Sequence, residues 1–244
     1  MKGCIVPEPL RAPTLMFDRI IAPSLLAADF ARLGEEARRV EQAGADWLHL
    51  DIMDGLVVPN ISFGTAVVSA VLRRTRLPFD VQLMVRRPND MLLSFVEAGA
   101  NWLTVHVESE HPDGVRSTLA RIRAAGCKAG LALNPKTPLS DAEPFFDAID
   151  LLLIMTVNPG FGGQTFIPAT VEKIETAYAK RAAAGWSFRI EIDGGVNRET
   201  AAVGLRAGAD VLVSGTSLFR VPDMAEEIRE LRGLPARKET ALRR

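Results

Sequence analysis

Cysteine and histidine are both scarce in this sequence of 244 residues. Its two cysteines, Cys4 and Cys127, lie far apart and form no Cys-x-x-Cys pair, so nothing indicates a disulfide framework. We therefore expect reduced thiols and a cytoplasmic protein. The three histidines, His49, His106 and His111, are few enough for each to be weighed as a catalytic or metal-binding residue.

The sequence also lacks an excess of charge of one sign and any long apolar run. Lysine and arginine together number 29 and aspartate and glutamate 30, which gives a formal net charge of −1. The arginines are scattered, without the basic stripe that binds nucleic acid. No apolar run approaches the roughly 18 residues of a membrane span, and prolines and charges between positions 7 and 13 interrupt any signal-peptide core. We expect neither a nucleic-acid nor a membrane partner.

What the sequence does contain is an alternation of short apolar runs with longer amphipathic stretches. Several runs are almost continuously apolar, which is typical of parallel strands that are covered on both faces. Asp29 and Asn197 precede two of the amphipathic stretches and are plausible helix N-caps. The predicted strands are 20–26, 47–52, 79–84, 102–107, 129–133, 151–155, 188–192 and 211–213. The predicted helices are 30–42, 67–74, 91–97, 115–125, 169–184, 200–206 and 224–231.

A weak repeat supports this division. The tripeptide Ala-Gly-Ala occurs at 43–45, 98–100 and 207–209, each time between a helical stretch and a strand. Gly126 and Gly185 occupy the same place in two other units, where a glycine with positive φ commonly ends a helix. Eight such units predict a barrel or a doubly wound sheet. We predict an α/β fold with a single (β/α)₈ TIM barrel over 19–233, an N-terminal extension over 1–18 and a polar tail over 234–244.

Two acidic motifs end predicted strands and favour the barrel, whose site residues come from the carboxyl ends of many strands. His49 and Asp51 are two residues apart on the second strand, so both point to one face, and Asp193 ends the seventh strand. Two carboxylates facing one ligand could move a proton α to a carbonyl from one face to the other. Such a reaction needs an electrophile, for example a metal ion, to stabilise the enediolate. A hydrogen-bonded polar layer inside the barrel explains His49 and Asp51 equally well.

Glycine-rich loops follow three neighbouring strands and predict a phosphate site without an obligatory arginine or lysine. Their clustered backbone N–H groups can hold an anion. Barrels often bind phosphate after the seventh and eighth strands. Ser24, after the first strand, could contact a sugar hydroxyl or only satisfy local backbone. The candidate residues of these loops are Gly160, Phe161, Gly162, Gly163, Gly194, Gly195, Gly215 and Thr216.

In their order and spacing these segments resemble the ribulose-phosphate 3-epimerase family, from about residue 20 to residue 219. The segments that carry the resemblance are Pro23-Ser24-Leu25, 49–55 with Pro59-Asn60, Leu83-Met84-Val85, 155–163 and 191–196. The resemblance implies a homo-oligomeric enzyme that interconverts D-ribulose 5-phosphate and D-xylulose 5-phosphate, a phosphorylated ketose being its small-molecule partner.

The resemblance also implies roles for individual residues. Asp51 would accept a proton and Asp193 donate one, while His49, Asp51 and Asp193 would bind a divalent metal. Ser24 would contact the sugar and the glycine loops the phosphate. Three methionines, Met53, Met84 and Met155, would line the reacting centre, although core packing explains them equally well.

Gln82 departs from the family pattern, which has a histidine there as the fourth metal ligand. An amide oxygen is a harder and weaker ligand than an imidazole nitrogen. Three outcomes are open: weaker binding of the metal with water or Gln82 as fourth ligand, preference for Mn or Mg over Zn or Fe, or a metal-free site in which Gln82 contacts substrate. We favour the first. His106 we interpret as a hydrogen-bonded strand-end histidine and His111 as a loop residue.

Other functions are compatible with the same barrel. The substrate could be another ketose phosphate, such as allulose 6-phosphate or a tetrulose phosphate. A Schiff-base lyase would need a lysine directed into the site from a strand, and only Lys136 lies near the carboxyl ends of the strands. The loss of a ligand histidine also raises the possibility of a barrel that binds a sugar phosphate without turning it over, but both aspartates are retained.

Overall fold

The structure is a computed structural model that describes residues 17–234. Its strands are β1 (Ile20–Pro23), β2 (Leu48–Met53), β3 (Phe79–Met84), β4 (Trp102–His106), β5 (Lys128–Leu133), β6 (Leu151–Met155), β7 (Arg189–Asp193) and β8 (Val211–Ser214). Its α-helices are α1 (Leu33–Gln42), α2 (Thr65–Leu72), α3 (Leu92–Glu97), α4 (Val115–Ala124), α5 (Val171–Ala184), α6 (Arg198–Ala207), α7 (Thr216–Phe219) and α8 (Met224–Leu231). Six short 3₁₀ helices lie at 25–27, 30–32, 88–90, 139–141, 143–145 and 168–170.

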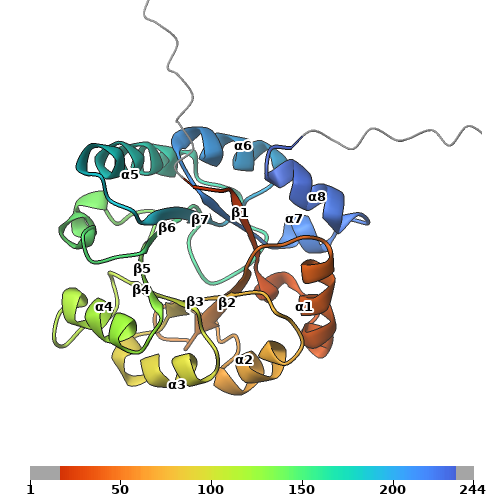
Figure 1. The fold of residues 1–244 in the computed structure, drawn as a ribbon, viewed down its shortest axis with the longest axis horizontal. Coiled ribbons are helices and arrows are strands. Elements are labelled where there is room, and N and C mark those ends of the chain that lie inside the picture. The colour runs from red at the N-terminus through yellow and green to blue at the C-terminus, as the bar shows by residue number, and fades with distance from the viewer. Residues whose placement is uncertain (1–16, 235–244) are drawn as a thin grey trace, which may run out of the picture.

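The strands form one parallel sheet in the order β1-β8-β7-β6-β5-β4-β3-β2. A single parallel bridge between Ser24 and His49 joins the two ends of this order, so the sheet is a nearly closed barrel. The helices surround the ring of strands (Figure 1). The prediction of one (β/α)₈ barrel is therefore confirmed. Most of the predicted extension 1–18 and tail 234–244 lies outside the described residues.

Local sequence explains most element boundaries. The Asn197 side chain accepts from the backbone N–H groups of Glu199 and Thr200 and forms a capping box at the start of α6. Asp29 accepts from Ala31 N–H, although the turn that it caps is a 3₁₀ helix that precedes α1. The expected strand 20–26 ends earlier, at Pro23, because the Ser24 hydroxyl caps the 3₁₀ turn that follows. Between β5 and β6 two 3₁₀ helices take the place of an α-helix.

The glycines of the repeat end helices with positive φ, as predicted. Gly208 has φ of 108°, and a Cβ there would lie 2.5 Å from the ring of Tyr178. The chain can therefore turn from α6 into β8 only with a residue that has no side chain at this position. The same conformation recurs at Gly44 and Gly99 in the other two copies.

The interior of the barrel changes from apolar to polar along its axis. At the amino ends of the strands, Trp47 and Trp102 stack with ring centroids 4.6 Å apart, among buried Leu151 and Val211. Further along, the strand register places His49 beside Asp80, Asp51 beside Gln82 and, last, Met53 beside Met84. The large apolar core lies outside this interior, between the strands and the helices. The candidate site residues are thus carried at the carboxyl ends of the strands.

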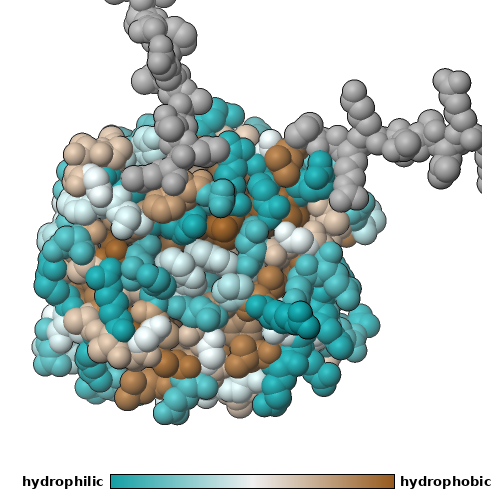
Figure 2. Space-filling view, in the orientation of Figure 1, coloured by the Kyte–Doolittle hydropathy of each residue, from teal (hydrophilic) through white to brown (hydrophobic). Residues whose placement is uncertain are grey.

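The face drawn in Figure 2 gives little indication of a partner. On the face drawn in Figure 2 most described residues are hydrophilic, and the apolar ones lie in small separate groups. None of the helices in residues 17–234 combines the length and apolar character needed to cross a membrane.

Candidate active site

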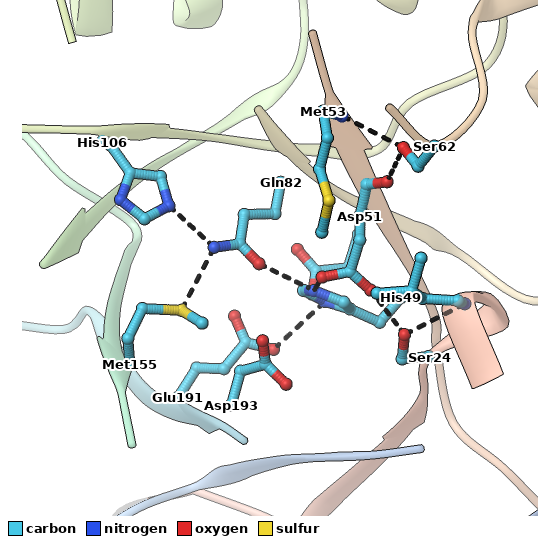
Figure 3. Close-up of polar contacts among 12 residues, drawn as sticks. Ser24, His49, Asp51, Met53, Ser62, Gln82, His106, Met155, Glu191 and Asp193 are labelled. Carbon is cyan, nitrogen blue, oxygen red and sulfur yellow. Dashed lines mark hydrogen bonds and ion pairs between the residues drawn. The ribbon is translucent and has the colours of Figure 1, made fainter. Parts of the chain in front are cut away.

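His49 is held at the centre of a buried polar cluster inside the barrel (Figure 3). Its Nδ1 lies 2.6 Å from Asp80 Oδ2, and its Nε2 lies 3.1 Å from Gln82 Oε1 and 3.6 Å from Asp51 Oδ1. Burial alone lowers the pKa of His49, but the charges of Asp80 and Asp51 outweigh burial and raise this pKa well above 6.5. The cluster therefore attracts a positive charge to His49 Nε2.

Asp51 is the ionised carboxylate of the cluster. It projects from β2 toward Ser24, whose hydroxyl donates a hydrogen bond of 2.5 Å to Asp51 Oδ2. The Ser24–His49 bridge between β1 and β2 brings this serine into reach. Burial would raise the pKa of Asp51, but the charge of His49 and the hydrogen bonds from His49 and Ser24 lower it below 3.8. Asp51 is thus available as a base.

Asp193, at the end of β7, has the opposite character. Burial and the negative charge of Asp51 raise its pKa to about 7. A carboxyl group that keeps its proton near neutral pH can act as an acid beside an ionised carboxylate. The two aspartates come from different strands, β2 and β7, and their pKa values are shifted in opposite directions.

The same residues form a group that can hold a metal ion. One ligand atom each from His49, Asp51 and Asp193 lies within 4.8 Å of the others, and imidazole and carboxylate groups suit a divalent cation. A second group in the described residues, His49, Asp80 and Glu191, is different in kind. Within it His49 Nδ1 is hydrogen-bonded to Asp80, and burial raises the pKa of Glu191 well above its ordinary value. We interpret this second group as the one that holds the His49 ring in position for the first.

A cavity of about 620 Å³ opens above the cluster at the carboxyl ends of the strands. His49 and Gln82 do not line it, because both are fully buried beneath its floor. Among the described residues no lysine or arginine lines it either. The predicted site residues that line the cavity are Ser24, Asp51, Met53, Met84, Met155, Gly160, Phe161, Gly162, Gly163, Asp193, Gly194, Gly195, Gly215 and Thr216.

The glycine loops approach one another on one side of this cavity. A Cβ on Gly195, whose φ is 66°, would lie 2.4 Å from the backbone nitrogen of Phe166, and one on Gly194 would lie 2.3 Å from Val157. A Cβ on Gly162 would lie 3.5 Å from the hydroxyl of Thr216. Close packing thus requires glycine at 194 and 195, whereas a side chain at 162 would make an ordinary contact.

Sequence reasoning missed several residues of the site. Leu26, Val157, Val213 and Ser217 also line the cavity, and each lies within three residues of a predicted site residue. That proximity is the signal that could have found them. His106 ends β4 and is hydrogen-bonded, as predicted, but its partner was not foreseen: its Nε2 lies 2.8 Å from Gln82 Nε2.

Comparisons with known proteins agree with this geometry. The model of the Ribulose-phosphate 3 epimerase family matches residues 20–219. The chain is 46% identical to the chloroplastic ribulose-5-phosphate-3-epimerase of Arabidopsis thaliana, over 92% of this chain and 79% of that one. It is 46% identical to the ribulose-phosphate 3-epimerase of Bacillus subtilis, over 87% and 98%.

Solved structures add evidence on the fold alone. A mutant tryptophan synthase α-subunit from Pyrococcus furiosus superposes with a TM-score of 0.65 at 17% identity, over 90% of this chain and 100% of that one.

Proposed function

The chain belongs to the ribulose-phosphate 3-epimerase family, and we propose that it interconverts D-ribulose 5-phosphate and D-xylulose 5-phosphate by proton transfer at C3. Membership of this family makes the chain an epimerase, which is an isomerase that acts on a phosphorylated sugar. The observation that carries the mechanism is the pair of aspartates, whose pKa values are shifted in opposite directions beneath one cavity.

In the proposed reaction Asp51 removes the proton from C3, next to the C2 carbonyl. The C3–H bond breaks, its electrons form the C2–C3 double bond, and the carbonyl oxygen gains negative charge. Asp193 then delivers its proton to the opposite face of C3, the C2 carbonyl re-forms, and the configuration is inverted. The hydrogen bond from Ser24 orients the Asp51 carboxylate. For the reverse reaction the two aspartates exchange roles.

His49, Asp51 and Asp193 would hold a divalent metal ion, which when bound supplies positive charge to the enediolate oxygens. The fit rests on the convergence of their ligand atoms within 4.8 Å. Zn, Fe, Mn and Mg are the candidate ions. Gln82 takes the place of the usual fourth ligand, and its Oε1 lies 3.1 Å from His49 Nε2.

The remaining contacts would bind substrate. The loops at Gly160–Gly163, Gly194–Gly195 and Gly215–Thr216 offer backbone N–H groups to the phosphate, in a cavity wall without a described lysine or arginine. The methionines Met53, Met84 and Met155 line the cavity, where they would surround the reacting carbon and exclude water.

The alternatives are less well supported by the described residues. A Schiff-base lyase needs a lysine in the cavity, and none of the described lysines lines it. The Nζ of Lys173 instead donates to the carbonyl oxygens of Asn134 and Pro135, at 2.9 and 2.7 Å. Lys136 is exposed and does not line the cavity. A barrel that only binds sugar phosphates would have no use for two aspartates of opposite protonation.

The test is conversion of D-ribulose 5-phosphate to D-xylulose 5-phosphate before chelation, after exhaustive chelation, and after each metal is added back. We expect activity that is lost with the metal and restored by at least one ion. Activity that survives chelation would support the epimerase function and reject the role of a metal in it. No conversion under any condition, together with turnover of allulose 6-phosphate or a tetrulose phosphate, would show that the substrate is another ketose phosphate.

A further inference from the structure

Gln82 is fully buried, and both ends of its amide meet a histidine. Its Oε1 lies 3.1 Å from His49 Nε2, and its Nε2 lies 2.8 Å from His106 Nε2 and 3.2 Å from Met155 Sδ (Figure 3). An amide can present oxygen or nitrogen to a given side, so its partners must decide which end faces the candidate metal site.

On the side of His106, Glu108 fixes the orientation of the Gln82 amide. Its carboxylate accepts from the backbone N–H of Asn134 at 2.8 Å and from the hydroxyl of Thr137, and it lies 3.3 Å from His106 Nδ1. A carboxylate can only accept, so His106 Nδ1 donates to Glu108. An amide nitrogen can only donate, so His106 Nε2 accepts from Gln82. The amide nitrogen is thereby committed to His106, and the amide oxygen faces His49.

On the other side the same logic starts from Asp80. His49 Nδ1 donates to Asp80 over 2.6 Å, so Nε2 is the ring nitrogen that faces Gln82 Oε1. Asp51 Oδ1 is 3.6 Å from the same nitrogen. His49 Nε2, Gln82 Oε1 and Asp51 Oδ1 therefore converge on one point. Either a proton on His49 Nε2 or a bound metal ion satisfies these groups, and a metal ion would displace the proton.

We propose that His106 is a positioning residue which, backed by Glu108, holds Gln82 so that its Oε1 serves as the fourth ligand of the metal site of His49, Asp51 and Asp193. The inference rests on the proposed function for the identity of the site. It explains how a chain without the usual fourth histidine keeps a four-ligand set: a histidine one strand further along the sheet fixes the amide that takes its place.

The test is the affinity of the purified full-length protein for Co²⁺, measured from the visible absorption of the bound ion. Replacing His106 by Leu removes the acceptor for the Gln82 amide, and we expect the Kd for Co²⁺ to rise about 10- to 100-fold, with a changed absorption spectrum. His106→Gln can offer an oxygen near the position of Nε2 and should restore most of the affinity.

Thr104→Val is the matched control. Thr104 lies two residues earlier on β4, is fully buried, and its hydroxyl has no hydrogen-bond partner among the described residues. This variant should bind Co²⁺ like the parent. Glu108→Ala should give a smaller loss of affinity than His106→Leu, and it provides the measurement if His106→Leu does not fold.

A double-mutant cycle separates positioning from general support of the barrel. If His106 or Glu108 acts through Gln82, its replacement should cause no further loss of Co²⁺ affinity in a Gln82→Ala background. Equal losses in both backgrounds, or unchanged affinity and spectrum in His106→Leu and Glu108→Ala, would overturn the inference.

The epimerase assay is read separately from Co²⁺ binding. Metal binding with the expected coupling but no epimerisation would reject the proposed function and keep the inference, whereas epimerisation with no coupling would do the reverse.

Discussion

The two sides of the cavity are built on different principles. On the side of β1 to β3, a few buried side chains would carry the proposed chemistry: Ser24, His49, Asp51 and Gln82 are fixed by mutual hydrogen bonds. On the side of β6 to β8, the loops present glycine backbone, and their shape depends on the absence of side chains. Asp193 is the exception, a reactive side chain placed between the glycine loops.

This difference separates two ways in which a substitution can damage the site. A change on the first side alters proton transfer or metal binding and leaves the cavity its shape. A change on the second side alters backbone conformation, so it reduces phosphate binding and stability together. Turnover, substrate binding and unfolding of matched variants on each side would show whether the two kinds of damage are separable.

The largest effect is expected for the two aspartates. Asp51→Asn or Asp193→Asn removes the proton acceptor or donor and should lower kcat by about 10²- to 10⁴-fold, with sugar-phosphate binding retained. Steady-state kinetics and equilibrium binding would measure both. Asp54→Asn is the matched control, because Asp54 lies nearby and outside the cavity, accepting from Arg86 N–H at 2.8 Å. If either the Asp51→Asn or the Asp193→Asn variant kept most of the parent's kcat, the two-carboxylate mechanism would be contradicted.

The next effect is expected on the glycine side. Gly195→Ala places a Cβ 2.4 Å from the Phe166 backbone nitrogen at a positive φ, and should raise KM while lowering the free energy of unfolding by about 1–3 kcal/mol. Gly162→Ala meets only the Thr216 hydroxyl, at 3.5 Å, and should unfold with nearly unchanged free energy. Equal stability of the two variants would show that the loops are not closely packed.

A moderate effect is expected in the pH dependence of stability. The pKa of Asp193 is about 7 in the folded chain against an ordinary 3.8, so the folded state binds the proton more tightly. Its contribution to stability is fully present below about pH 4 and is lost as pH rises toward 7. Denaturant titrations with a chelator present should show Asp193→Asn gaining stability relative to the parent over this range, by roughly 3–4 kcal/mol. A constant difference between parent and variant would contradict the raised pKa.

The smallest effect is expected where the two sides touch. Asn60, on the loop after β2, donates from Nδ2 to the carbonyl oxygen of Gly160 at 2.8 Å. Asn60→Ala should loosen the β6 loop, raise KM a few-fold and cost about 1 kcal/mol of stability. An unchanged KM would show that the β6 loop keeps its position without this contact.

Much of this molecule could be predicted because its signals are local. The apolar runs, the Asn197 cap and the repeated glycines each depend on a few adjacent residues. The motifs around Asp51 and Asp193 directly follow apolar strand residues, so each motif marks the carboxyl end of its strand. The family resemblance joined these motifs into one site. The homo-oligomer and the cytoplasmic location stay predictions.

What could not be predicted depends on the stagger between strands. The sequence left open whether Gln82 binds the metal or contacts substrate. The register of β2, β3 and β4 places its side chain beneath the cavity, in contact with His49 and His106. No pattern along a single strand encodes that depth. The early end of β1 and the 3₁₀ helices after β5 likewise follow from tertiary contacts and side-chain caps.

The most direct test of the two-carboxylate mechanism is to run the conversion of D-ribulose 5-phosphate in D₂O and locate the deuterium. If Asp51 takes the C3 proton and Asp193 returns another, each D-xylulose 5-phosphate formed should carry solvent deuterium at C3, and Asp193→Asn should still exchange the C3 proton of one epimer without producing the other. Conversion without deuterium at C3 would contradict the account.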